Sequence, residues 1–247
     1  PARRAELLRT AGADAVVLLR TDRELLRLSP ADFFARVVAE GLRARAVVEG
    51  FNFRFGRGRA GDTGTLRELC ASAGIRFREL PPRTIDGETV SSSRVRAALR
   101  AGDVRKAARC LGRPYRVCGR VGTGQRRGRS LGFPTANLEG VETLVPGEGV
   151  YAVRARAGGG TWPAAANVGP NPTFGEPERK IEVHLIGFDG DLYGQELAAD
   201  FVERLRDTRP FAGVEELVAQ LREDVARAQA VLRGDGEERL EGCPNPT

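Results

Sequence analysis

The chain changes its pattern abruptly at residues 111–114, which read Leu-Gly-Arg-Pro. Before this point, apolar runs at residues 15–19, 46–48 and 75–80 alternate with stretches of helical periodicity. Beyond it, short β-rich runs lie between Gly and Pro turns, at residues 115–121, 150–157, 164–168 and 181–188. Strands that alternate with helices predict a parallel sheet, whereas closely spaced strands with turn residues predict an antiparallel barrel. We therefore expect two domains of different class.

Local signals mark where the helices begin and end. Ser29 and Pro30 predict the start of a helix that Gly41 ends, and Asp103 predicts the cap of another that Gly112 ends. A final helix is predicted from apolar residues at helical spacing: Val214, Leu217, Val218, Leu221, Val225 and Ala228. These signals predict an α/β domain over residues 1–112, a barrel domain with a C-terminal helix over 113–233, and a disordered tail over 234–247.

The charge of the chain admits two interpretations. There are 39 Lys and Arg against 33 Asp and Glu, a net charge of +6, and Lys occurs only at Lys106 and Lys180. The excess could attract polyanions, or it could reflect a bias toward Arg in a GC-rich gene; charge balance alone specifies little, and we favour the bias. The four cysteines lack metal-ligand spacing, and no run of about 18 apolar residues exists, so we expect a cytoplasmic protein with reduced thiols.

One short motif carries most of the chemistry. Residues 132–137 read Gly-Phe-Pro-Thr-Ala-Asn and follow a run rich in Gly and Arg. Glycines let backbone N–H groups close on a phosphate, and arginines supply charge for it. The fixed kink at Pro134 presents the Thr135 hydroxyl and the Asn137 amide oxygen, which are hard ligands suited to Mg²⁺. The motif predicts a site for magnesium and nucleotide phosphates.

Several stretches occur in an order that identifies a family. They lie at residues 111–115, 128–137, 149–152, 167–174, 181–185, 191–194 and 201–211. This ordered set resembles the riboflavin kinase module, and the segment before it resembles part of an FMN adenylyltransferase with a Rossmann-like nucleotidyltransferase fold. The chain as a whole resembles the bacterial bifunctional riboflavin kinase/FMN adenylyltransferases, also called FAD synthetases, without the front of the first domain.

The resemblance implies roles for residues of the second module. Thr135 and Asn137 would bind Mg²⁺ and ATP beside Pro134, and Glu182 would be the base that accepts the proton of the ribityl hydroxyl. Arg206 would lie near a flavin ring held between the barrel and the final helix. A flap over the phosphates would be formed by Gly122, Gly124, Gly128, Arg129 and Gly132.

Glu182 and His184 also have an interpretation that involves no catalytic role. Strand alternation puts Glu182 and His184 on one face, and the pattern alone favours a polar outer surface there. His184 is the only histidine, so we interpret it as an orienting or packing residue rather than a metal ligand.

The first module resembles the adenylyltransferase only in part. Residues 49–62, including Asn52, resemble its flavin- and nucleotide-side loop. A triphosphate motif at the start of a helix would be formed by Ser91, Ser92, Ser93, Arg94 and Arg96, although the local pattern alone favours a simple serine cap. The family's His-x-Gly-His motif is absent, because the one histidine lies in the other module. We therefore expect FAD synthesis to be lost in this chain.

The leading hypothesis is an enzyme that converts riboflavin to FMN with ATP and Mg²⁺. The alternatives are a flavin- or nucleotide-binding protein that has lost catalysis and a basic nucleic-acid-binding protein with a small barrel. We expect small-molecule substrates (riboflavin, FMN and ATP), no nucleic-acid or membrane partner, and a monomer or weak oligomer.

Overall fold

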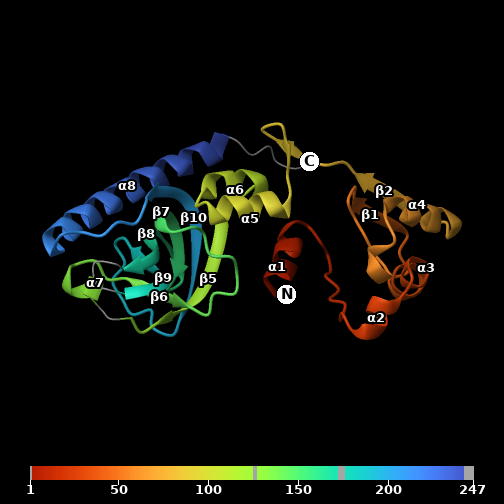
Figure 1. The fold of residues 1–247 in the computed structure, drawn as a ribbon, viewed down its shortest axis with the longest axis horizontal. Coiled ribbons are helices and arrows are strands. Elements are labelled where there is room, and N and C mark those ends of the chain that lie inside the picture. The colour runs from red at the N-terminus through yellow and green to blue at the C-terminus, as the bar shows by residue number, and fades with distance from the viewer. Residues whose placement is uncertain (1, 125–126, 172–175, 242–247) are drawn as a thin grey trace. The chain divides into compact units, whose positions relative to one another are not determined.

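The computed structural model describes residues 2–124, 127–171 and 176–241 (Figure 1). The chain forms two compact units, residues 1–83 and 84–247, and each is described by itself. The family resemblance and the pattern change at residue 112 suggested a later boundary. The reason for the difference lies in two helices of the second unit.

The first unit contains a pair of parallel strands with helices around them. Strand β1 (Ala46–Gly50) pairs in parallel with β2 (Arg76–Leu80), as the apolar runs predicted. Its helices are α1 (Ala2–Thr10), α2 (Arg23–Arg27), α3 (Pro30–Phe33), η1 (Phe34–Gly41), η2 (Arg57–Arg59) and α4 (Thr63–Ser72). The Ser29 side chain accepts a hydrogen bond from the backbone N–H of Asp32, so the predicted cap is present. A small core joins these elements through Phe34, Phe55, Leu66 and Cys70.

The predicted strand at residues 15–19 is absent. These residues have no regular structure, and Val17 and Leu18 are 62% and 66% exposed. Their apolar run satisfied the pattern of a buried strand, but a strand also needs a hydrogen-bonded neighbour, and within the described residues β1 and β2 pair only with each other. Val48 in β1 is 54% exposed, although an apolar run of this kind is typical of a buried parallel strand.

The second unit is built on a closed antiparallel barrel. Its strands are β5 (Tyr115–Gly122), β6 (Ala136–Glu139), β7 (Gly149–Ala157), β8 (Gly160–Asn171), β9 (Glu176–Leu185) and β10 (Glu196–Arg206). They close in the order β10-β5-β6-β9-β8-β7. The remaining elements are a hairpin, β3 (Thr84–Ile85) with β4 (Glu88–Thr89), and the helices α5 (Ser92–Arg100), α6 (Val104–Leu111), α7 (Arg127–Ser130) and α8 (Val214–Glu241). The predicted barrel and final helix are therefore confirmed.

Two strands of the barrel were not predicted. Strand β6 has only four residues, which is too short for a clear alternation. Strand β10 shifts its register against β7 between Phe201 and Glu203 and again between Arg204 and Arg206. Such bulges add residues to one strand and interrupt the period-two pattern from which strands are recognised.

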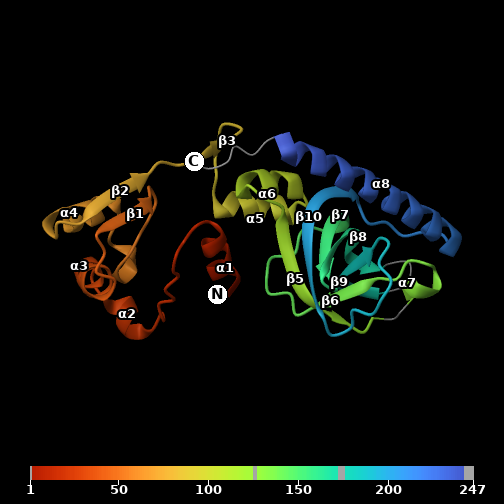
Figure 2. The ribbon, with the colours of Figure 1, turned by 180° about the vertical axis from the view of Figure 1, so that it is seen from behind.

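Helices α5 and α6 pack onto the barrel, which explains where the second unit begins. Ala98, Leu99, Val104 and Ala107 are buried in the same cluster as the inward side chains of the strands. The Gly147 N–H donates a 2.7 Å hydrogen bond to the Leu99 carbonyl. Figure 2, seen from behind, shows both helices beside β5 and β10.

Helix α8 covers part of the outer wall of the barrel (Figure 1). Its residues Ala228 and Leu232 are buried against Val150, Ala152 and strand β10. Of the apolar positions predicted for this helix, Ala228 is fully buried and Val214 is half exposed. The helix continues to Glu241, so residues 234–241 are not the irregular tail that we predicted, and residues 242–247 lie outside the described part.

Candidate active site

A row of polar side chains crosses the outer wall of the barrel. Asn137 in β6 is paired with Glu182 in β9, and Glu182 is paired with Asn167 in β8. The residues that flank them in sequence are buried inside the barrel: Ala136, Leu138, Ile181, Val183, Ala166 and Val168. Because side chains alternate across a strand, Asn137, Glu182 and Asn167 share the outer face. The predicted separation of Glu182 and His184 from the apolar residues of β9 is confirmed.

The turn before β6 folds tightly against α7. The Phe133 N–H donates a 2.8 Å hydrogen bond to the Gly128 carbonyl. A Cβ atom at Gly128 would lie 2.3 Å from the Phe133 oxygen and 3.3 Å from the Thr135 hydroxyl. No side chain fits there, so glycine lets the α7 backbone approach the Thr135 hydroxyl directly.

The end of β5 approaches β6 in the same way. A Cβ at Gly124 would lie 2.2 Å from Asn137 Nδ2, and one at Gly122 would lie 2.0 Å from the Glu139 carboxylate. The glycines therefore permit close contact between backbone and polar side chains rather than a particular turn. They gather around the two side chains that were predicted to bind metal and nucleotide, Thr135 and Asn137.

A hollow opens beside this cluster. It has a volume of about 430 Å³, within the usual range of small-molecule sites, and both acidic and basic side chains line it. Its residues are Thr123, Gly124, Asn137, Leu138, Glu139, Val141, Val145, Arg179, Lys180 and Ile181. Since Asn137 belongs to both, the hollow and the polar row form one continuous candidate site.

The donors of this site are oxygens, which suit hard cations such as Mg²⁺. Within the described part of the chain, no group of three His, Cys, Asp or Glu side chains is placed to hold an ion. Thr135 and Asn137 offer two neutral oxygens, one from the residue just before β6 and one from β6 itself. Mg²⁺ commonly keeps waters and phosphate oxygens and takes few protein ligands, so this donor set fits Mg²⁺ bound together with a nucleotide.

Arg206 is not among the residues that line the hollow beside the polar row, and it already has a partner. Its Nε and Nη2 donate to the two carboxylate oxygens of Asp224 on α8, at 2.8 and 2.7 Å, and its Nη1 donates to the Asp207 carbonyl. Asp224 is only 1% exposed. Arg206 therefore joins β10 to α8, and its predicted proximity to a flavin stays a prediction.

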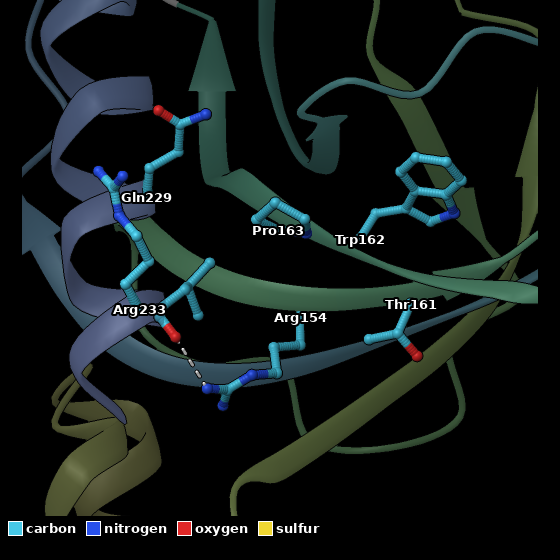
Figure 3. A pocket seen from close by; sticks show the side chains of 7 residues that line it. Arg154, Thr161, Trp162, Pro163, Gln229 and Arg233 are labelled. Carbon is cyan, nitrogen blue, oxygen red and sulfur yellow. Dashed lines mark hydrogen bonds between the residues drawn. The ribbon is translucent and has the colours of Figure 1, made fainter. Parts of the chain in front are cut away.

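A second hollow, of about 350 Å³, lies where α8 meets β7 and β8 (Figure 3). Gln229 and Arg233 line it from the helix, and Pro163 lines it from β8. Arg154 donates a 3.1 Å hydrogen bond to the Leu232 carbonyl at its margin. None of the predicted site residues lines this hollow, Arg206 included.

Several predicted residues belong neither to the polar row nor to the lining of the hollow beside it. Arg129 and Gly132 are exposed, and Gly132 has a φ of +82°. Asn52 is exposed in the first unit, whereas Ser91, Ser92, Ser93, Arg94 and Arg96 belong to the second. Ser91 caps α5 by accepting a hydrogen bond from the Arg94 N–H, which is the simpler of the two interpretations given above.

Arg94 is largely engaged within its own unit. Its Nη1 donates to the carbonyls of Ile85 and Glu88, both at 2.9 Å, and its Nη2 lies 2.8 Å from the Glu88 carboxylate. The side chain is 11% exposed. In this structure Arg94 holds the β3–β4 hairpin against the start of α5, and its role in binding a triphosphate stays a prediction.

Asn167 is the site residue that sequence reasoning missed. It lies in a stretch that supported the family resemblance, but only the β8–β9 register places it opposite Glu182. A single strand does not specify which residue of its neighbour lies opposite each of its own, because the register is decided by how the strands pair in the barrel.

The barrel, its covering helix and the polar row with the glycine-lined turn define a class of transferases, the riboflavin kinases. A family model described as riboflavin kinase matches residues 111–232, and one described as FAD synthetase matches residues 1–94. The chain belongs to the family of bifunctional riboflavin kinase/FMN adenylyltransferases. Among the described residues, no helix has the length and apolar content needed to cross a membrane.

Several relatives align with most of the chain. A bifunctional riboflavin kinase/FMN adenylyltransferase of Pseudomonas fluorescens is 39% identical over 93% of this chain and 74% of its own length. One from Bacillus subtilis is 36% identical over 88% of this chain and 69% of its own. A crystal structure described as a macrolide-efflux protein from Streptococcus pneumoniae aligns with a TM-score of 0.83 and 31% identity, over 93% of this chain and 74% of that one.

Proposed function

We propose that this chain transfers the terminal phosphoryl group of ATP to the terminal ribityl hydroxyl of riboflavin, which yields FMN and ADP. One observation carries the proposal: within a riboflavin kinase barrel, Glu182 is paired across the strands with Asn137, two residues from Thr135. This arrangement puts a carboxylate beside the two neutral oxygen donors of the glycine-lined turn.

Each part of the reaction has a candidate group in the site. The hydroxyl oxygen bonds to the γ-phosphorus while the bond from that phosphorus to the β–γ bridging oxygen breaks, and ADP leaves with the electron pair. Glu182 accepts the hydroxyl proton. Negative charge on the phosphate oxygens would be stabilised by backbone N–H groups of the Gly-rich segment and by the guanidinium of Arg129.

Thr135 and Asn137 are the residues that would hold Mg²⁺. When bound, the ion neutralises charge on the phosphate oxygens. The protein's own contribution is to hold the two donors two residues apart, Thr135 in the turn that enters β6 and Asn137 in β6, so that the nucleotide is kept in line with the acceptor hydroxyl.

The proposal is confined to the kinase reaction. The FAD synthetase match covers the first unit, but the family motif with two histidines finds no counterpart in a chain whose single histidine is His184. We therefore expect FMN and no FAD.

Chromatography of a reaction with riboflavin, ATP and Mg²⁺ tests the proposal. We expect FMN from the unmodified chain and a fall in kcat of at least about 100-fold in Glu182→Gln, the lower range for loss of a positioned base. Glu203→Gln is the matched control, because Glu203 is a carboxylate of β10 paired with Arg105 at 2.5 Å. Absence of FMN from the unmodified chain would refute the function, and full turnover in Glu182→Gln would remove Glu182 from the mechanism.

A further inference from the structure

His184 makes a hydrogen bond that the reaction described above does not use. Its Nδ1 lies 2.8 Å from the carbonyl oxygen of Pro134. A carbonyl oxygen can only accept, so Nδ1 must carry the proton, and in the neutral imidazole the lone pair is left on Nε2. The tautomer is therefore dictated by the contact.

The bond extends the pairing of two strands past the point where backbone pairing stops. Ala136 and Asn137 of β6 are paired with Val183 and Glu182 of β9. Continued by one step, this antiparallel register brings Thr135 opposite His184. No backbone pairing is present at that step, and the imidazole makes the connection by reaching the carbonyl of the preceding residue.

A second contact fixes the same turn. The Phe133 ring meets the imidazole edge-on, with ring centroids 5.5 Å apart and an interplanar angle of 66°. His184 thus contacts both residues that precede Thr135, one through its ring and one through Nδ1. Pro134 has a restricted φ and no N–H of its own, so its carbonyl is the polar backbone group through which it can be held.

We propose that His184 is a positioning residue for phosphoryl transfer: by holding Pro134 and Phe133 it sets the Thr135 hydroxyl and Asn137 against the glycine-lined turn. This inference rests on the proposed function. His184 acts through the turn, without touching the reacting atoms. The ligand it serves is the metal-bound triphosphate rather than the flavin, because the turn that it holds carries the two oxygen donors.

The first test is spectroscopic and independent of activity. The chain contains one histidine, so the ¹⁵N imidazole signals of labelled protein come from His184 alone. At a pH where the ring is neutral, we expect the tautomer protonated on Nδ1, whereas free histidine in water favours Nε2. A neutral ring protonated on Nε2 would overturn the proposal whatever the kinetics.

The second test separates the hydrogen bond from the ring contact. His184→Phe keeps a ring against Phe133 and removes the donor, whereas His184→Asn keeps an N–H donor at nearly the position of Nδ1. We expect His184→Phe to lower kcat/KM for ATP about 10–100-fold, the usual effect of losing a group that orients a metal ligand, with little change in KM for riboflavin. His184→Asn should recover most of this loss.

Each kinetic outcome decides the inference. Full activity in His184→Phe, or equal losses in both variants at similar thermal midpoints, would show that the donor is not what matters. If KM for riboflavin rose in parallel in His184→Phe, the loss would come from general distortion of the barrel, and the positioning role would be refuted. If the unmodified chain makes no FMN, the proposed function fails, and the tautomer alone then tests the contact.

Discussion

The buried pair of Arg206 and Asp224 gives the most quantitative prediction about this fold. Both nitrogens of the guanidinium edge donate to the carboxylate, at 2.8 and 2.7 Å, and Gln220 approaches one of its oxygens at 3.3 Å. The Asp224 side chain is 1% exposed and that of Arg206 is 17% exposed. The pair joins the last residue of β10 to the middle of α8.

Asp224→Ala should cost about 3 kcal/mol of the free energy of unfolding. Removing one partner of a buried ion pair costs about 3–5 kcal/mol, because the other charge is left without compensation. Because Arg206 keeps some access to water, we expect the loss of free energy to lie at the lower end of this range. For a unit of this size the thermal midpoint should fall by about 6–12 °C.

Urea denaturation followed by tryptophan fluorescence measures this change in the correct unit. The chain has a single tryptophan, Trp162, which lies in β8 of the barrel. Glu223→Ala is the matched control, since it removes an exposed carboxylate next to Asp224 and should change stability by less than about 0.5 kcal/mol. A loss below about 1 kcal/mol in Asp224→Ala would refute our reading of the pair as buried and tightly coupled.

Two further variants test other parts of the molecule. Gly124→Ala would put a Cβ 2.2 Å from Asn137 Nδ2 and turn the amide away. We expect kcat/KM for ATP to fall about 10-fold or more while the urea midpoint stays unchanged. Gly213→Ala is the control, because nothing lies within 4 Å of its Cβ, and it should change neither quantity. Burial raises the pKa of Tyr151, whose hydroxyl donates a 2.5 Å hydrogen bond to the Gly147 carbonyl. The folded state therefore holds this proton more tightly than the unfolded state, and its stabilising effect is complete below about pH 10 and declines as pH rises further. Between about pH 8 and pH 11, the urea midpoint of the unmodified chain should fall, and that of Tyr151→Phe should fall less. Equal falls in the two proteins would contradict the assignment of this pH dependence to Tyr151.

Signals that act over a few residues predicted the local structure well. The caps at Ser29 and Asp103 and the left-handed Gly112 were visible in the sequence, because each satisfies backbone groups within the next turn of its own helix. The alternation of Glu182 and His184 with apolar neighbours also depends on one strand alone. The run at residues 15–19 shows the limit of such signals, since an apolar run does not contain its partner strand.

The site could be predicted in its parts but not as an arrangement. The family resemblance singled out Thr135, Asn137 and Glu182, and the structure places Glu182 opposite Asn137 across a strand pair. The resemblance did not indicate that Asn167 lies opposite Glu182, nor that Arg206 forms an ion pair with Asp224. These relations join residues that are 15 to 45 positions apart and depend on how the strands register around the barrel.

By itself, the sequence determined the class of the two units, several helix boundaries and the residue types of the candidate site, because these follow from chain stiffness, side-chain period and capping. The tertiary structure alone decided that α5 and α6 belong with the barrel, that glycines rather than side chains face Asn137 and Thr135, and that His184 reaches Pro134. The physical reason is that close packing and strand register are set by the whole closed barrel. No segment of the chain can form these contacts before the distant strands have paired.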